Sequence, residues 1–288
     1  MVLWPEPRLA SSTDEARAYT GTAQLRQHYA ANGYCISPPL IDGPTLDRAR
    51  TAVAAVMAGR YDTGVPPIYR NWEPSDPPRA LVKIDLPHLC SRDLWQLVAD
   101  PRIGAWAASV LSVAFVQWWA CELIFKAPEA HPGVARQGVV GWHQDDRFWA
   151  HWDGEVFTLW LALGEVNERM GPLRYVLGSH RWGAQQPARF FFDSDLEAQR
   201  TVIGVPPGQT WHEEAATLPA GAVSMHHRMT LHASEPNRGD MPRIGLAMHL
   251  RTERARLVST REPPFHSPDL LDMHACPVLF GVAERALT

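Results

Sequence analysis

Hydrophobic and polar residues divide the chain into a helical first part and a strand-rich second part. Residues 13–31 predict a helix that opens with an N-cap threonine and early acidic residues and stops at Gly33. Residues 44–61 predict a second helix with a proline in its first turn, and residues 92–112 predict a pair of helices broken near Pro101. The first part of the chain is therefore expected to be mainly helical.

Beyond residue 113 the pattern changes to short runs rich in β-branched and aromatic residues. The longest are AFVQWWACELIFKAPE, residues 114–129, and EVFTLWLAL, residues 155–163. LRYVLGSH, GAVSMHH, TLHAS and PRIGLAMHLRT follow at short intervals, with Gly, Pro and Asn between them. Helices followed by many short strands predict an α+β fold, with a β-sandwich or jelly roll at its centre and the early helices packed outside it.

The length of 288 residues fits one large domain or two small ones, and we find no internal repeat or low-complexity linker. We therefore predict a single domain over residues 1–288. Its expected parts are a helical region at about 1–112, a jelly-roll core at about 113–255 and a C-terminal extension at 256–288. Pro-rich segments at 62–80 and 184–210 predict long loops.

Charge and composition limit the kinds of binding partner and the cellular compartment that we expect for the protein. The formal net charge is −4 at pH 7, and no basic block of the kind that binds phosphates is present, which argues against nucleic acid as a partner. The N-terminus lacks the pattern of a signal peptide, and no apolar run is long enough for a transmembrane helix. The four cysteines are far apart and form no CxxC motif. These features predict a cytoplasmic protein with reduced thiols and no membrane partner.

The stretch GWHQDDRFWAHWDG, residues 141–154, contains two histidines that each stand two residues before a carboxylate. If the stretch is a strand, side chains two apart point to the same face, and an imidazole and a carboxylate converge as in a metal site. The pattern occurs three times in the chain, at His143/Asp145, His151/Asp153 and His212/Glu214. Each pair is a weak signal alone, so the deciding question is which pair has a third ligand elsewhere.

A candidate third ligand lies in TLHASEPNRGDMPRIGLAMHL, residues 230–250. His232 is placed in a short strand, and Ser234 is two residues further on, on the same face. A turn then reverses the chain, so Arg243 is expected beside His232 in an antiparallel hairpin. Two histidines and one carboxylate can hold a redox iron and leave positions open, and the planar guanidinium of Arg243 matches the carboxylate of a dicarboxylate cosubstrate.

Together these motifs resemble the phytanoyl-CoA dioxygenase family of iron(II)/2-oxoglutarate oxygenases. HQD at residues 143–145, the stretch GPLRYVLGSH, and His-x-Ser with an arginine eleven residues after the histidine are specific in combination. LRQHYAANGYCISPPLI, LVKIDL, LIFKAPE and EVFTLWLAL also occur in the family order, so the resemblance covers most of the chain. It implies a double-stranded β-helix, the cupin-like jelly roll, in agreement with the strand pattern.

The resemblance also implies roles for individual residues. The metal ligands, which form the catalytic centre, would be His143, Asp145 and His232. The cosubstrate 2-oxoglutarate would contact Arg243, Ser234, Lys83 and Trp160, while the Gln144 side chain would point away from the metal. The residues just beyond the HQD motif are the expected substrate contacts: Arg147, Phe148 and Trp149.

The implied reaction uses Fe(II), 2-oxoglutarate and O2 to hydroxylate an unactivated C–H bond, with succinate and CO2 as coproducts. We expect the substrate to be a small, largely apolar metabolite such as a natural-product intermediate. Halogenation is not expected, because Asp145 stands where halogenating relatives have a small residue. Whether the protein is a monomer or a homodimer stays open.

The same residues also fit three different functions. An acyl-CoA hydroxylase of the same chemistry would favour a basic rim, for which Arg70, Arg79, Arg147 and Arg174 are candidates, although they are scattered along the chain. A jelly-roll protein could also bind a metal or ligand without catalysis. A zinc hydrolase could use the same three ligands but would leave Arg243 and Ser234 unexplained.

The other histidines have simpler interpretations. His151 is expected in a surface or substrate loop with Asp153, and His212 lacks partners. His180, in the GSH stretch, is expected to bond backbone in a turn. His226 or His227, which precede the His232 strand, could pack beneath the metal site.

Overall fold

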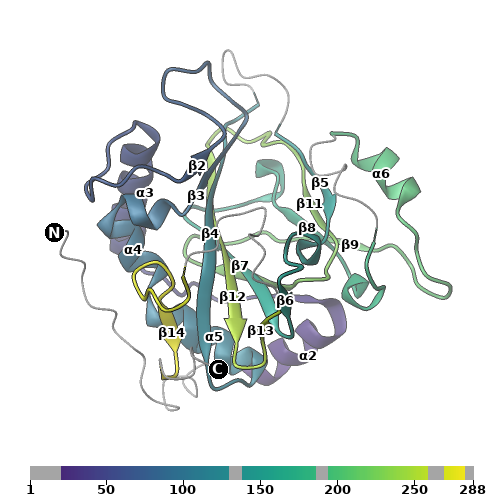
Figure 1. The fold of residues 1–288 in the computed structure, drawn as a ribbon. Coiled ribbons are helices and arrows are strands. Elements are labelled where there is room, and N and C mark those ends of the chain that lie inside the picture. The colour runs from purple at the N-terminus through teal and green to yellow at the C-terminus, as the bar shows by residue number, and fades with distance from the viewer. Residues whose placement is uncertain (1–20, 130–137, 186–193, 259–268, 283–288) are drawn as a thin grey trace.

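The long strands β4 (Val116–Lys126) and β12 (Arg243–Thr252) run side by side through the middle of the larger of two sheets (Figure 1). The computed structural model describes residues 21–129, 138–185, 194–258 and 269–282. In this part of the chain the larger sheet is antiparallel and follows the order β1-β10-β7-β12-β4-β3-β2, with β14 also paired to β4. Its other strands are β1 (Tyr34–Ile36), β2 (Tyr69–Arg70), β3 (Leu81–Asp85), β7 (Val156–Ala162), β10 (Val223–His227) and β14 (Val278–Phe280).

The smaller sheet is antiparallel too and follows the order β5-β11-β8-β9. Its strands are β5 (Val140–His143), β11 (His232–Ser234), β8 (Leu173–Val176) and β9 (Glu213–Ala215). A separate short pair joins β13 (Arg256–Leu257) to β6 (Trp152–Asp153). The sandwich of antiparallel sheets is the arrangement that the strand pattern predicts.

Helices cover the outer face of the larger sheet, as predicted. They are α2 (Thr22–Asn32), α3 (Gly43–Met57), α4 (Arg92–Val98) and α5 (Pro101–Leu111), with α6 (Leu196–Val202) beside the smaller sheet (Figure 1). Within the described ranges, four short 3-10 helices complete the elements: η1 (Pro87–Cys90), η2 (Asp145–Phe148), η3 (Glu168–Met170) and η4 (Ser179–Arg181). None of the helices in the described ranges is long and apolar enough to cross a membrane.

The predicted helices are found with small shifts of their ends. The break near Pro101 is confirmed, because α4 ends before it and the Asp100 side chain accepts a hydrogen bond from Arg102 N at the start of α5. The first predicted helix is described only from residue 21 onward. The expectation that residues 184–210 form only a loop is wrong, since α6 lies within them.

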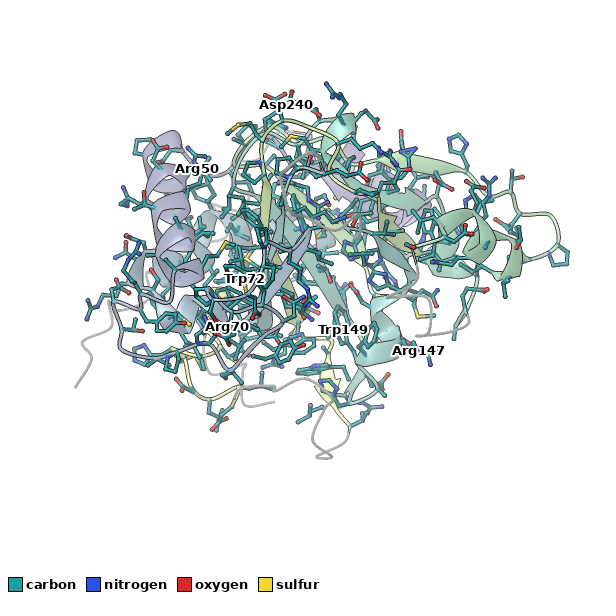
Figure 2. The ribbon with its side chains drawn as sticks, turned by 90° about the horizontal axis from the view of Figure 1, so that it is seen from above. Arg50, Arg70, Trp72, Arg147, Trp149 and Asp240 are labelled. Carbon is teal, nitrogen blue, oxygen red and sulfur yellow. The ribbon has the colours of Figure 1, made fainter. Side chains whose placement is uncertain are left out.

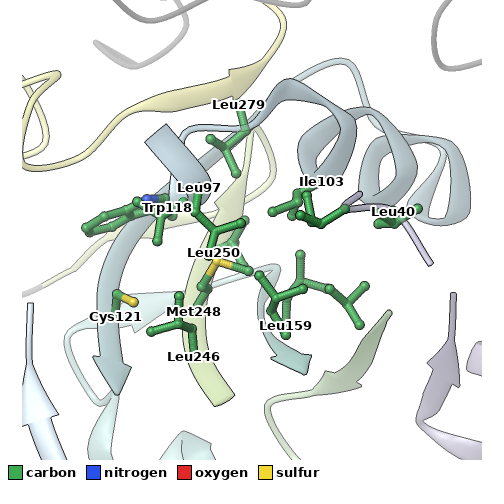
Figure 3. Close-up of a cluster of buried hydrophobic side chains, with 14 of the residues drawn as sticks. Leu40, Leu97, Ile103, Trp118, Cys121, Leu159, Leu246, Met248, Leu250 and Leu279 are labelled. Atoms are coloured by element: carbon green, nitrogen blue, oxygen red, sulfur yellow. The ribbon is translucent and has the colours of Figure 1, made fainter. Parts of the chain in front are cut away.

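Successive side chains of β12 point to opposite faces of the larger sheet. One face packs against the helices in the hydrophobic core, and the other faces the interior of the jelly-roll barrel that the two sheets form. Leu246, Met248 and Leu250 belong to the main hydrophobic cluster between the sheet and the helices, together with Leu159 of β7 and Ile103 of α5 (Figure 3). The intervening residues of the strand, from Arg243 to His249, therefore point the other way, toward the smaller sheet. The outer face of the larger sheet therefore buries apolar side chains against the helices, and its inner face can carry polar groups.

The predicted hairpin between His232 and Arg243 is wrong. Strand β11 pairs with β5 and β8 in the smaller sheet, whereas β12 pairs with β4 and β7 in the larger sheet. Residues 235–242 carry the chain from one sheet to the other. The two side chains therefore face each other across the barrel instead of lying beside each other on one face.

The C-terminal segment is part of the larger sheet. Strand β14 pairs with β4, and Leu279 packs against helix α5 at Gly104. A Cβ atom built on Gly104 would lie 2.4 Å from the Leu279 Cβ and 2.5 Å from its carbonyl oxygen. Glycine is therefore required where this helix and strand approach each other.

We predict that Gly104→Ala destabilises the fold by about 1–3 kcal/mol, because overpacking at this contact forces the helix and the strand apart. The measurement is the free energy of unfolding in urea. Gly43→Ala in α3 is the matched control, since its added Cβ would meet nothing within 4 Å. Equal stability of Gly104→Ala and the wild type would contradict the close packing of β14 on α5.

Candidate metal centre

His143 and Asp145 converge at the end of strand β5. His143 is the last residue of the strand, and Asp145 is the first residue of the 3-10 helix η2. The His143 Nε2 atom lies 3.8 Å from Asp145 Oδ1. The convergence predicted from the sequence is present, but a tight turn after the strand produces it instead of alternation along one strand.

His232 completes the cluster from the neighbouring strand. It lies opposite His143 in the antiparallel pairing of β11 with β5, and the two ring centroids are 4.0 Å apart. Its Nε2 atom is 3.6 Å from Asp145 Oδ1. The three potential ligand atoms lie within 4.8 Å of one another, and no other group of three such side chains occurs among the described residues.

The backbone sets the tautomers of both histidines. The Nδ1 atom of His143 is 2.8 Å from Gly141 O, and that of His232 is 2.9 Å from Thr230 O. Because a carbonyl oxygen only accepts, each Nδ1 carries a proton, and Nε2 is the nitrogen that faces the centre of the cluster and is available to a metal. Burial and the nearby His232 lower the pKa of His143 to about 3, so this imidazole is neutral and able to bind a metal.

The Asp145 carboxylate has one oxygen for each side of the site. Its Oδ2 accepts hydrogen bonds from Thr158 Oγ1 at 2.6 Å and from His226 Nε2 at 3.0 Å. Its Oδ1 is left facing the two ligand histidines. Burial alone would raise the pKa of Asp145, but His232 and His226 bring it well below its ordinary value, so the group is a carboxylate at neutral pH.

A short hydrogen-bond chain holds His226 in place. Its Nδ1 lies 3.1 Å from the Tyr175 hydroxyl, which in turn is 2.5 Å from Ser224 Oγ. Since Nε2 donates to Asp145, Nδ1 accepts from Tyr175. His226 is therefore the histidine beneath the site, and it supports a ligand without being one of the three. The sequence motifs did not indicate Thr158 or Tyr175, which belong to no short pattern.

Arg243 lies buried on the inner face of the larger sheet. Only 1% of the residue is exposed, its guanidinium donates to Gly171 O, and its Cζ lies 5.0 Å from the ring centroid of Trp160. A Cβ built on Gly245 would lie 2.1 Å from the Trp160 ring, so this glycine makes room for the indole. Burial lowers the pKa of Arg243 to about 9. Among the described residues no carboxylate forms an ion pair with it.

The other predicted cosubstrate contacts differ in their surroundings. Ser234 is buried and lies in the smaller sheet beyond His232. Lys83, on the inner face of β3, pairs with Glu122 Oε1 at 2.7 Å and lies 3.8 Å from Asp85 Oδ1. Its contact with the cosubstrate stays a prediction, because this ammonium is already held by carboxylates.

The three predicted substrate contacts have unequal access to the site. Arg147 is exposed on η2, whereas Trp149 is buried inside (Figure 2). The ring of Trp149 packs against His249 at 4.8 Å and Trp119 at 5.3 Å between centroids. The partly buried Phe148 ring lies 6.3 Å from that of His143. Trp149 thus forms part of a rigid wall, and Phe148 lies nearest to the ligands.

The remaining histidine–acid pairs form no site in the described residues. His151 is buried against Trp119, while the exposed Asp153 pairs with Arg256 at 2.7 Å, so the two side chains do not converge. His212 and Glu214 are both exposed.

Three further expectations from the sequence are confirmed. The Gln144 side chain points away from the metal cluster and bonds the backbone of Gly183, Met229 and Gln185. His180 Nε2 lies 3.2 Å from the backbone oxygen of Ala30. The cysteines are all buried and unbridged: Cys35, Cys90, Cys121 and Cys276.

A model of the phytanoyl-CoA dioxygenase (PhyH) family matches residues 29–245. Two curated relatives are each 26% identical to the chain, a probable alpha-ketoglutarate-dependent hypophosphite dioxygenase of Stutzerimonas stutzeri and an L-proline trans-4-hydroxylase of Streptomyces griseoviridis. The matches cover 57% and 54% of this chain. They span only 55% and 62% of the respective relatives' own lengths.

The fold is shared with a solved structure. The non-heme alpha ketoglutarate dependent carbocyclase SnoK from nogalamycin biosynthesis superposes with a TM-score of 0.66 at 19% sequence identity. The superposition covers 93% of this chain and 99% of SnoK. The predicted fold class, an α+β protein with a cupin-like jelly-roll core, is thereby confirmed.

We predict that His143→Ala or His232→Ala abolishes binding of a divalent metal ion, because each removes one of three ligands. His151→Ala is the matched control and should leave binding intact, since its ring packs against Trp119 away from the cluster. Calorimetric titration with Fe(II) in the absence of oxygen measures the affinity. Loss of the metal in His151→Ala with retention in His143→Ala would show that the wrong pair was chosen.

We also predict that His226→Ala weakens metal binding roughly 10-fold to 100-fold, the usual effect of removing a group that orients a ligand. The free Asp145 carboxylate would then lose one of the two hydrogen bonds that hold Oδ2. His227→Ala serves as the control, because the His227 ring accepts from Met229 N and does not touch Asp145. Equal metal affinity in both variants would remove His226 from the support of the site.

Proposed function

The chain belongs to the phytanoyl-CoA dioxygenase family, and on this premise we propose that it is an Fe(II)/2-oxoglutarate-dependent oxygenase that hydroxylates an unactivated C–H bond of a small metabolite. The observation that carries the proposal is a pair of sites on facing sheets. His143, Asp145 and His232 form a ligand set suited to iron. Arg243 faces them as a buried cation without a carboxylate partner among the described residues.

The ligand set fits Fe(II) in its chemistry. Two imidazole nitrogens and one carboxylate oxygen would hold the ion and would leave positions free for the cosubstrate and O2. When bound, iron and 2-oxoglutarate together activate O2 for oxidation of the substrate and release succinate and CO2. The hydrogen bonds from Thr158 and His226 keep Asp145 oriented toward the ion, so that the protein fixes the ligand geometry before binding.

We propose that the far carboxylate of 2-oxoglutarate binds the Arg243 guanidinium. A guanidinium can donate two parallel hydrogen bonds to a carboxylate, and the low dielectric of the interior strengthens them. Ser234 supplies a hydroxyl from the opposite sheet, and the Trp160 ring forms the wall beside Arg243. Lys83 would reach the cosubstrate only by leaving Glu122, so we assign it the weakest role of the four.

The substrate is proposed to be a small, largely apolar metabolite that approaches past η2. Phe148 lies nearest to the ligands, the buried Trp149 helps to exclude water, and Arg147 is placed to meet a polar group at the rim. A natural-product intermediate is favoured by the structural similarity to SnoK. The curated relatives, one acting on hypophosphite by its name and one on L-proline, differ widely in substrate and so do not narrow the choice.

The charges near the site favour a free metabolite over a coenzyme A ester. Arg70 pairs with Glu73, and Arg174 pairs with Glu213 at 3.3 Å, so two of the four candidate arginines are already neutralised by carboxylates. A rim for the coenzyme phosphates would need cations that are free to bind them. Acyl-CoA hydroxylation is therefore the second candidate within the same chemistry.

A zinc hydrolase and a non-catalytic binding protein can be distinguished from an oxygenase by binding and turnover. A zinc hydrolase has no use for a buried arginine opposite its ligands, and binding of 2-oxoglutarate would exclude it. A binding protein without catalysis would bind the metal and ligand but release no succinate. The decisive experiment is a screen of candidate metabolites for substrate-dependent release of succinate from 2-oxoglutarate, with O2 consumption as the second readout. Absence of 2-oxoglutarate binding by the iron-loaded protein would refute the proposed function.

We predict that Arg243→Ala raises the KM for 2-oxoglutarate far more than it changes metal affinity. Losing one partner of a buried charge-assisted pair costs about 2–5 kcal/mol, roughly 30-fold to several-thousand-fold in affinity. Steady-state kinetics with varied 2-oxoglutarate measure the KM, and titration with Fe(II) checks the metal. An unchanged KM would mean that another residue holds the far carboxylate.

We predict that Asp145→Gly loses most hydroxylation, because it removes a ligand and its negative charge. The variant also leaves a gap the size of a small anion and raises the net charge of the site by one, so chloride binding at the metal is expected. The measurements are product formation and a chloride-dependent change in the absorption band of the iron–2-oxoglutarate complex. Near wild-type hydroxylation without added carboxylate would show that Asp145 is not a required ligand.

A further inference from the structure

Lys126 is a buried lysine at the end of β4, directly opposite Arg243 in the pairing of β4 with β12. None of the residue is exposed, and among the described residues no carboxylate forms an ion pair with it. Two buried basic side chains, Lys126 and Arg243, thus lie on neighbouring strands at the same end of the larger sheet. Such an arrangement is costly unless an anion is bound there, because a buried charge must be paired to offset its lost hydration.

The Lys126 ammonium donates to three oxygen atoms of the opposite sheet and its following loop. Its Nζ lies 2.6 Å from Ser234 Oγ, 3.2 Å from Ser234 O and 2.7 Å from Glu235 O. An ammonium has three N–H donors and no acceptor, so these contacts use all of them. Lys126 therefore has no donor left for a ligand, and it acts on a ligand only through its charge and through Ser234.

The contact with Lys126 determines what the Ser234 hydroxyl can do. A hydroxyl has one donor and two acceptor positions, and Lys126 occupies an acceptor position. The O–H bond must consequently point away from Lys126, which leaves it to donate to another group. An acceptor placed between Ser234 and Arg243 would receive a hydrogen bond from each sheet and would feel the positive charge of both Lys126 and Arg243.

We propose that Lys126 is a positioning residue for 2-oxoglutarate, which holds the Ser234 hydroxyl as a donor to the far carboxylate and thereby favours a dicarboxylate over a monocarboxylate. The inference rests on the proposed function. Burial and the neighbouring Arg243 guanidinium lower the pKa of Lys126 well below its ordinary value although Glu235 raises it, and a bound carboxylate would favour the charged ammonium.

The test compares two ligands that differ only at the far end. The protein is loaded with Mn(II), a non-turnover probe, and titrated calorimetrically with 2-oxoglutarate and with 2-oxovalerate, which lacks the far carboxylate. Lys126→Met keeps an unbranched side chain only one atom shorter than lysine but removes its charge and donors. We expect it to weaken 2-oxoglutarate binding roughly 10-fold to 100-fold, the effect of losing a hydrogen bond to a charged group. Binding of 2-oxovalerate and of Mn(II) should stay unchanged.

A double-variant cycle tests whether Lys126 acts through Ser234. If it does, Lys126→Met should weaken 2-oxoglutarate binding less in the Ser234→Ala background than in the wild type. If the fold-losses of 2-oxoglutarate affinity in the two single variants simply multiply in the double variant, the two residues act independently and the positioning role is overturned. Lys126→Gln, which also removes the charge, provides the same comparison if Lys126→Met does not fold.

The outcomes separate this inference from the proposed function. If the wild-type protein binds Mn(II) but neither 2-oxo acid, the proposed function fails and the inference falls with it. If the wild type prefers 2-oxoglutarate and Lys126→Met keeps that preference, only the inference fails. Equal weakening of both ligands, or loss of Mn(II), would show that Lys126 serves packing and would overturn its role in recognition.

Discussion

The Asp145 carboxylate joins the two sheets of the barrel, and the geometry of the site depends on it. One oxygen faces His143 and His232 of the smaller sheet. The other accepts from Thr158 and His226 of the larger sheet. Because Oδ2 accepts two hydrogen bonds in a buried setting, the carboxylate cannot rotate without breaking bonds that water would not replace. The spacing of the sheets at this level therefore fixes the relative positions of the three candidate metal ligands.

The second constraint is the unequal distribution of charge inside the barrel. At one end, the Asp145 carboxylate and the imidazoles of His143 and His232 form a group that could hold a cation. At the other end, Arg243 and Lys126 are ready for an anion, and no carboxylate among the described residues pairs with them. The apolar cluster on the outer face of the larger sheet offsets the cost of these buried charges. A ligand with a metal-binding end and a carboxylate end complements both regions at once, which is the shape of 2-oxoglutarate.

Much of the site could be predicted from the sequence because its motifs are local. HQD and His-x-Ser place ligand types within a few residues, and the structure brings His143, Asp145 and His232 together as expected. The predicted hairpin failed because the sequence pattern of two consecutive strands does not reveal whether they share a sheet. In a jelly roll the chain crosses between sheets, so Arg243 reaches the site from the opposite side. Thr158 and Lys126 were missed because each is a single polar residue in a buried strand, and only the alternation of its strand marks it as facing inward.

The two inward-facing lysines, Lys83 and Lys126, differ in how far nearby carboxylates compensate their charge. The resemblance points to Lys83, but Glu122 and Asp85 lie beside its ammonium and largely cancel its field. Lys126 lies in LIFKAPE, but the resemblance assigned it no role. Its three hydrogen-bond partners are a hydroxyl and two carbonyl oxygens, and Glu235 is the carboxylate that acts on its charge without forming an ion pair. A charge contributes to long-range attraction of an anion only to the extent that nearby opposite charges leave it uncompensated. An anion beside Arg243 would therefore be attracted mainly by Arg243 and Lys126, and Lys83 would add to this attraction only if a bound ligand drew it away from Glu122.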